Sequence, residues 1–287
     1  MLSGAKAEIA ADHGGFAPVE RIEGSLEAGV AVLCDHAANA LPSQYGDLGL
    51  PPGAFDRHIA YDIGAAWLAR GLADRLRAPA VLSTFSRLLI DPNRGADDPT
   101  LVMRISDGAI VPGNARVEAA EIERRRERYW LPYRESCARL VGAMNATGLA
   151  PAIVSVHSFT PFWRGRPRSW KVGVLWDRDP RLAQPLLAAL AQERDLQPPR
   201  ELIGDNEPYD GALAGDTIDE IATARGFANA LIEVRQDLIA AQPDAEAWAD
   251  RLARLLRPIL ARPELHRRAE FGSRARERIH GAEEDRG

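Results

Sequence analysis

Residues 29–36 have the sequence GVAVLCDH, a short apolar run that ends in an aspartate and a histidine. A run of this length and composition is typical of a buried strand. A second such run, AIVSVH at Ala152–His157, also ends in a histidine. In parallel sheets, apolar strands are covered on both faces and ligands collect at the carboxyl ends of the strands. The two runs therefore predict buried strands that carry His36 and His157 to the edge where a site is expected.

Further apolar runs alternate with helical patterns along the chain. Strands are predicted over Gly29–Cys34, Ala80–Thr84, Leu88–Asp91, Ala152–His157, Lys171–Trp176 and Ala228–Val234. The second and third of these are either two short strands or one broken strand. Helices are predicted over Asp56–Leu76, Arg116–Met144 with an interruption near Pro132, Arg181–Arg194, Thr217–Arg225 and Asp244–Leu260. This alternation predicts a three-layer α/β fold in which helices flank a mixed, mainly parallel sheet. We expect one domain over residues 21–263, a loose lead-in over 1–20 and a charged tail over 264–287.

Composition narrows the class of protein. The chain has 287 residues, 46% of them hydrophobic, and a formal net charge of -5, so nucleic acid is not expected as the main partner. Cys34 and Cys137 are too few for a disulfide framework and form no Cys-x-x-Cys pair. No signal peptide or apolar run of membrane-spanning length is found, so we expect a cytoplasmic protein without a membrane partner. Nothing in the sequence predicts an oligomeric state.

Four residues are candidate metal ligands. Imidazole is a common zinc ligand, so His36 and His157 at strand ends can bind a metal, although a hydrogen-bonded structural histidine is the plainer alternative. His58 and Asp62 are four residues apart in the predicted helix, which would place both side chains on one face. A surface ion pair or a helix cap is the alternative for that pair.

The segment Ser83–Arg94, STFSRLLIDPNR, places Arg87, Asn93 and Arg94 around a predicted strand end. Arginine forks bind carboxylates through two parallel hydrogen bonds, so this segment is a candidate carboxylate site. The alternative is that Asp91, Asn93 and Arg94 only build a turn around Pro92.

Glu233 lies in the mostly apolar segment ALIEVRQD. A buried carboxylate is costly unless it is paired or used, and burial can raise its pKa into the working range of a general acid or base. A salt bridge to Arg235 is the alternative. The G-x-S-x-G, G-x-x-x-x-G-K-[ST] and H-E-x-x-H motifs are absent, which disfavours elbow-type serine hydrolases and phosphate cradles.

Six segments in order resemble the N-formylglutamate amidohydrolase family. They are VLCDHAANALP, RHIAYDIGA, SRLLIDPNR, ERYWLPYRE, VSVHSFTP and ALIEVRQDLI, spread between about residues 29 and 256. The family is related to zinc carboxypeptidases and deacylases. The resemblance implies a zinc-carboxypeptidase-like, or phosphorylase/hydrolase-like, α/β fold. It also implies hydrolysis of the amide bond of an N-acyl amino acid, with N-formyl-L-glutamate as the expected small-molecule carboxylate substrate.

The resemblance also implies one divalent metal ion, with zinc expected, held by His36 and His157. A carboxypeptidase pattern has a glutamate three residues after the first histidine, where this chain has Asn39, so the third ligand must be His58 or Asp62. The family's Pro-His-Ser-Gly segment is Asp35-His36-Ala37-Ala38 here, which indicates a divergent branch.

The remaining roles follow from the same resemblance. Glu233 matches the general acid/base, and Arg87 an arginine near the scissile carbonyl. Asn93 and Arg94 match a pair that grips the substrate carboxylate, and Arg235 could help with a second carboxylate. A carboxypeptidase, a deacylase for another acylated amino acid, and a non-catalytic carboxylate-binding protein on the same fold are the alternatives.

Overall fold

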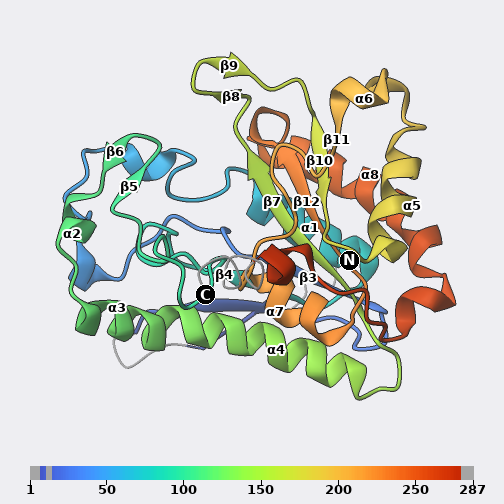
Figure 1. Cartoon of the computed structure of the whole chain (residues 1–287), viewed down its shortest axis with the longest axis horizontal. Coiled ribbons are helices and arrows are strands. Elements are labelled where there is room, and N and C mark those ends of the chain that lie inside the picture. The colour runs from blue at the N-terminus through green and yellow to red at the C-terminus, as the bar shows by residue number, and fades with distance from the viewer. Residues whose placement is uncertain (1–6, 11–14, 279–287) are drawn as a thin grey trace.

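The computed structural model describes residues 7–10 and 15–278, and its main feature is one mixed sheet (Figure 1). The described strands follow the order β1-β2-β4-β3-β7-β12-β10-β11. Their bounds are β1 Ala7–Ala10, β2 Val19–Ile22, β3 Val30–Cys34, β4 Ala80–Ser83, β7 Ala152–Phe159, β10 Val172–Leu175, β11 Ile203–Asp205 and β12 Asn229–Arg235. Parallel pairs join β4, β3, β7 and β12 in the centre, and β10 to β11 at one edge. The predicted mixed, mainly parallel sheet is confirmed.

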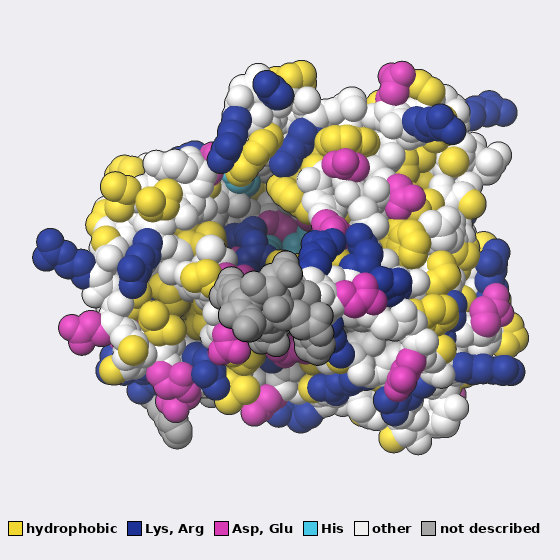
Figure 2. Space-filling view, in the orientation of Figure 1, with side chains coloured by type: hydrophobic (Ala, Val, Ile, Leu, Met, Phe, Trp, Pro, Cys, Tyr) yellow, Lys and Arg dark blue, Asp and Glu magenta, His cyan; other side chains and the backbone are white. Residues whose placement is uncertain are grey.

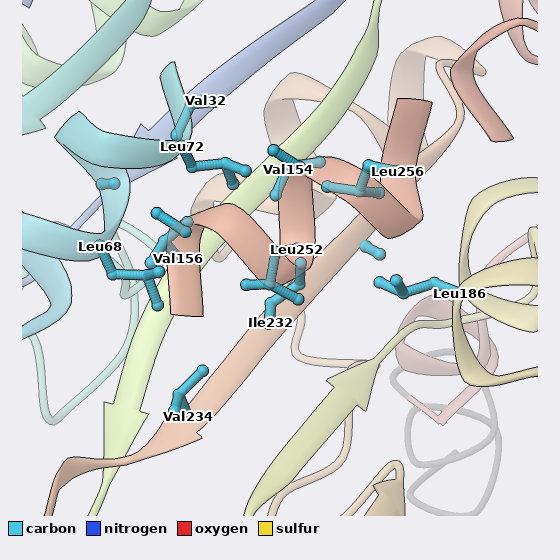
Figure 3. Close-up of a cluster of buried hydrophobic side chains, with 14 of the residues drawn as sticks. Val32, Leu68, Leu72, Val154, Val156, Leu186, Ile232, Val234, Leu252 and Leu256 are labelled. Atoms are coloured by element: carbon cyan, nitrogen blue, oxygen red, sulfur yellow. The ribbon is translucent and has the colours of Figure 1, made fainter. Parts of the chain in front are cut away.

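Helices cover both faces of the sheet. On one face lie α1 (Ala65–Leu76), α5 (Pro180–Leu190) and α8 (Gln242–Leu260), and on the other lie α4 (Leu131–Asn145) and α7 (Thr217–Ile221). Figure 3 shows the first core, in which leucines from α1, α5 and α8 pack on valines and an isoleucine of β3, β7 and β12. Full burial of each such side chain contributes roughly 1.5–3 kcal/mol. The three-layer arrangement is therefore as predicted.

The long helical region before β7 is interrupted where the sequence indicates. Helix α3 (Ala119–Arg125) continues through a π-helical turn, Arg126–Trp130, into α4. Pro132 is at the start of α4. Proline has no backbone N–H, and the wider turn before it accommodates the missing hydrogen bond.

Two predicted elements are wrong. The helix over Asp56–Leu76 begins only at Ala65, because Gly64 has a left-handed φ of 81°. A Cβ at Gly64 would lie 2.1 Å from the carbonyl oxygen of Ile239, so the chain must turn there and residues 57–64 form a loop. Leu88–Asp91 is not a strand. It is a buried turn, in which Leu89 N–H donates to Ser86 O and Asp91 N–H donates to Leu101 O.

Small elements complete the fold at both ends of the chain and above the sheet. Strands β1 and β2 extend the sheet beside β4, so regular structure occurs in the region expected to be a loose lead-in. Two hairpins extend beyond the main sheet, β5–β6 (Ile105–Ser106 and Ala109–Ile110) and β8–β9 (Phe162–Trp163 and Arg166–Pro167). Two further short helices are α2 (Pro112–Ala115) and α6 (Pro199–Leu202). Within the charged tail, residues 274–278 are helical. The boundaries at residues 20 and 263 stay predictions.

In the part of the chain that the structure describes, no helix is long and apolar enough to cross a lipid bilayer. Cys34 and Cys137 are both buried and neither forms a disulfide.

Candidate metal centre and its pocket

The register of β7 against β12 places His157 beside Glu233. The two residues are direct partners in the parallel ladder. Side chains alternate along a strand, and Val156, Ile232 and Val234 point into the core under α1 and α8. His157 and Glu233 therefore lie on the opposite face. Strand β7 continues to Phe159, so His157 lies within the strand rather than at its predicted end.

Two loops bring the other members of the site to the same place. His36 follows β3, the neighbour of β7. The loop over residues 57–64 packs against it, because Asp62 N–H donates to His36 O at 2.9 Å. One donor atom each from His36, Asp62 and His157 lies within 4.8 Å of the others, and all three residues are buried. This cluster could hold a metal ion.

Both histidines present Nδ1 to the cluster. Nδ1 of His157 lies 2.8 Å and Nδ1 of His36 lies 3.5 Å from Asp62 Oδ2. The Nε2 atoms are engaged on the far side, with His36 Nε2 2.7 Å from Asp91 Oδ1 and His157 Nε2 3.0 Å from Asp35 Oδ2. A carboxylate behind each imidazole is the usual support of a metal-binding histidine, since it fixes the tautomer and the ring orientation.

Two observations fit a cation at this cluster. Nδ1 of His36 is buried and has no hydrogen-bond partner. Asp35, Asp62 and Asp91 are also buried around the two histidines. Arg87 lies 2.7 Å from Asp91 and 3.6 Å from Asp62, and it forms no ion pair with Asp35. Buried charges of one sign are costly unless they are compensated. A divalent cation bound between the imidazoles and Asp62 would offset the excess negative charge.

The carboxylates of the cluster are held ionised. Burial raises the pKa of Asp91, but the charges of Arg87 and His36 outweigh it and hold that pKa well below its usual range. Asp62 and Asp35 have lowered pKa values in the same way, through the neighbouring histidines against the effect of burial. Thr217 Oγ1 and Ser155 Oγ also donate hydrogen bonds to Asp35.

Glu233 behaves differently from these aspartates. Burial, together with the charge of Asp62, raises its pKa to about 7, and the nearby histidines and Arg87 only partly oppose this. Its Oε2 atom is buried and has no hydrogen-bond partner. Glu233 can therefore accept and release a proton near neutral pH.

The segment after β4 supplies polar groups to the site and also builds a turn. Arg87 donates to Asp91 Oδ2 through both Nε and Nη2, and Asp91 Oδ1 accepts from Asn93 N–H. Asn93 Oδ1 accepts from Thr217 N–H. Arg94 lies nearby, with its Nε 3.9 Å from Asp98 Oδ2. The turn interpretation is therefore confirmed. Arg87, Asn93 and Arg94 also line the pocket, and carboxylate binding by this segment stays a prediction.

Two candidate residues lie outside the cluster. His58 lines the pocket, but its Nε2 lies 3.5 Å from Asp107 Oδ2, and it is not among the three clustered ligands. The expectation that His58 and Asp62 share a helical face fails because no helix forms there. Arg235 does not line the pocket. It binds Asp237 and donates to the carbonyl oxygens of Arg168, Ser169 and Trp170, so it does not contact Glu233.

The three residues of the cluster line a cavity of about 510 Å³. In Figure 2 a hollow opens in the middle of this face, with histidine and acidic side chains visible in its depth and basic side chains beside it. The walls include residues that sequence reasoning missed, namely Met103, Asp107, Trp163, Tyr209, Asp210, Asp216 and Arg278. Asp35 and Asp91, which bind the two histidines, lie close in the sequence to predicted site residues. No motif or spacing in the sequence marks either of them as a member of the site.

Comparison with known proteins gives a family match and similar solved structures. A family model described as N-formylglutamate amidohydrolase matches residues 28–240. A solved gene product of Agrobacterium tumefaciens is 30% identical, with a TM-score of 0.79 over 88% of this chain and 98% of that one. A solved N-formylglutamate amidohydrolase from Ralstonia eutropha JMP134 is 23% identical, with a TM-score of 0.60 over 85% of this chain and 99% of that one, which shows a shared fold. A search of curated proteins finds no match.

Proposed function

Because the chain belongs to the N-formylglutamate amidohydrolase family, we propose that it is a metal-dependent hydrolase of the amide bond of an N-acyl amino acid. The observation that carries the proposal is the convergence of His36, Asp62 and His157 beside Glu233 in one cavity. The three possible metal ligands, with an aspartate behind each histidine, lie next to a carboxyl group whose pKa is near neutrality. Such an arrangement is suited to hydrolysis.

The donor set favours zinc. Two imidazole nitrogens and one carboxylate oxygen are donor types found in catalytic zinc sites. His36, His157 and Asp62 would hold the ion, so Asp62 rather than His58 is the proposed third ligand. Such an ion supplies Lewis-acid polarisation of a carbonyl group and lowers the pKa of a water molecule.

Glu233 is the proposed general base and acid. Its unpartnered Oε2 takes a proton from the attacking water and later delivers it to the amide nitrogen of the leaving amino acid. Arg87 is the proposed stabiliser of negative charge on the former carbonyl oxygen. Its Nε and Nη2 bind Asp91, its Nη1 lies at a longer distance of 3.6 Å from Asp62 Oδ1, and the residue lines the cavity.

Asn93 and Arg94 are the proposed binding groups for the substrate carboxylate. Both line the cavity, and the ion pair that Arg94 forms with Asp98 is long, with 3.9 Å between Nε and Oδ2. N-formyl-L-glutamate is the proposed substrate because of the family. The cavity of about 510 Å³ falls within the range of pockets for drug-sized ligands, so longer acyl groups belong in the test as well.

A paired measurement of metal content and turnover tests the proposal. The purified protein should contain about one equivalent of zinc by elemental analysis and should release glutamate from N-formyl-L-glutamate or from another member of a panel of acylated glutamates and dipeptides. Glu233→Gln should keep the metal and lose turnover, whereas His157→Ala should lose the metal. A wild-type protein that binds a carboxylate ligand tightly without metal and without turnover would instead be a non-catalytic binding protein.

A further inference from the structure

The loop over residues 206–211, which carries Tyr209, is packed tightly against the sheet. Gly173 of β10 and Gly204 of β11 are partners in the ladder. A Cβ would lie 2.1 Å from the carbonyl oxygen of Glu207 at Gly173 and 2.2 Å from it at Gly204. The loop can approach this closely only because both strands have glycine there.

Side chains hold the two ends of this loop. Asn206 Oδ1 accepts from Trp176 N–H at 2.9 Å and from Gly211 N–H at 3.0 Å. Asp210 pairs with Arg274 at 2.9 Å and with Arg278 at 2.7 Å, two arginines of the C-terminal segment. The backbone on both sides of Tyr209 is thus fixed.

This loop passes beside the proposed general base. Gly173 is also the antiparallel partner of Glu233. Because the carbonyl group of Glu207 lies over Gly173, the loop backbone is next to the strand position of Glu233. Tyr209 lines the same cavity as Glu233 and the metal cluster. Burial, followed by the charge of Glu233, raises the pKa of Tyr209, which keeps its hydroxyl protonated at neutral pH.

Arg168 fixes the direction of that hydroxyl. The Arg168 side chain is largely buried, its guanidinium lies 5.0 Å from the centre of the Tyr209 ring, and its Nη1 donates to Tyr209 Oη at 3.1 Å. Guanidinium has donors and no acceptor, so Oη must accept from it. Within residues 7–10 and 15–278, the Tyr209 hydroxyl donates to no protein acceptor, and its proton remains available to a ligand.

We infer that Tyr209 is a substrate-contacting residue whose hydroxyl donates a hydrogen bond to an oxygen of the bound substrate, and that Arg168 is the residue that positions it. The inference rests on the proposed function of the cavity. The hydroxyl would bind the acyl carbonyl oxygen or a carboxylate oxygen of the substrate, the two acceptor types that an N-acyl amino acid offers.

Tyr209→Phe tests this contact, because it removes the hydroxyl and keeps the ring. We expect kcat/KM for the best panel substrate to fall at least tenfold, as loss of a positioned donor commonly costs roughly a hundredfold or more. In the zinc-loaded Glu233→Gln protein, Tyr209→Phe should also weaken calorimetric binding of that substrate. Tyr45→Phe, outside the cavity, is the matched control and should change neither value.

The outcomes separate the two proposals. If the wild-type enzyme turns over its substrate and Tyr209→Phe has the same kcat/KM and Kd, the inference is overturned. The proposed function then remains intact. A wild-type protein that neither hydrolyses nor binds any panel member overturns both.

A double-mutant cycle tests the positioning role of Arg168. Arg168→Met should lower kcat/KM in the wild-type background and have little further effect in the Tyr209→Phe background, because both changes remove the same contact. A purely structural role would give losses that multiply. Thermal unfolding of the same variants checks that they remain folded, and independent losses of activity in the folded proteins would refute the positioning role.

Discussion

His36 and His157 owe their orientation to aspartates from distant segments. Asp91 lies 55 positions from His36 in the sequence, and Asp35 lies 122 positions from His157, yet each binds the Nε2 atom of its histidine. Residue type and strand position were enough to select the two histidines as ligand candidates. The choice of Nδ1 as the atom that faces Asp62 was not predictable, because it depends on contacts that only the fold creates.

Glu233 leads to a prediction about pH. A general base must be ionised to work, and the pKa of Glu233 is raised to about 7, so protonation at lower pH removes the active form. We expect kcat/KM to fall as the pH decreases, with a limb at or below about pH 7, since a bound cation would lower the pKa. A profile of kcat/KM between about pH 5 and 9 measures it.

Asp216 provides the control for that assignment. Its carboxyl group lines the same cavity and burial also raises its pKa to about 7. The Asp216→Asn variant should keep the acidic limb of the profile. If the acidic limb disappears in this variant, the group that titrates is Asp216 and not Glu233.

At the scale of elements, apolar strands were predictable and irregular segments were not. Strands β3, β7, β10 and β12 all fall within two residues of their predicted ends, because continuous burial on both faces requires continuous apolar sequence. The helix over Asp56–Leu76 was predicted too long, because the residues before Ala65 form a loop. Ile59 instead packs in a separate small core with Leu48 and Leu88.

Gly64 separates the loop that carries Asp62 from helix α1, and it gives a prediction about stability. Gly64→Ala would force a side chain into a left-handed conformation with its Cβ 2.1 Å from Ile239 O. The left-handed conformation alone costs roughly 1–2 kcal/mol, so we expect the free energy of unfolding to drop by at least about 2 kcal/mol. Urea denaturation measures the change.

A second glycine gives the matched control. Gly142 lies on the exposed side of helix α4, has an ordinary helical backbone and has no atom within 4 Å of an added Cβ. Gly142→Ala should raise the free energy of unfolding by roughly 0.5–1 kcal/mol, through the better helix propensity of alanine. Equal effects of the two substitutions would show that Gly64 does not have the proposed role.

At the scale of the whole molecule, the sheet gathers charges that the linear sequence keeps apart. The segments around residues 35, 62, 91, 157 and 233 meet beside the cavity only through the strand order β4-β3-β7-β12. Sequence patterns and the family resemblance together selected eight of the pocket-lining residues in advance, and the strand runs indicated which edge of the sheet they occupy. Tyr209 and Arg168 carried no such signal, because their roles depend on a loop folded over two glycines.

This concentration of buried carboxylates predicts that metal stabilises the entire fold. Without a cation, the buried Asp35, Asp62 and Asp91 are compensated mainly by the neighbouring histidines and Arg87, and the unfolded chain lacks an organised site. At free zinc a hundredfold above Kd, binding to the native state adds about 2.7 kcal/mol to the free energy of unfolding. Calorimetric scans should therefore show a Tm several degrees higher with zinc than with a chelator.

His157→Ala should abolish that difference, and Mg²⁺, which prefers all-oxygen ligands, should reproduce little of it. Equal Tm values for the zinc-saturated and chelated wild-type protein would contradict a metal site built into the core of this fold.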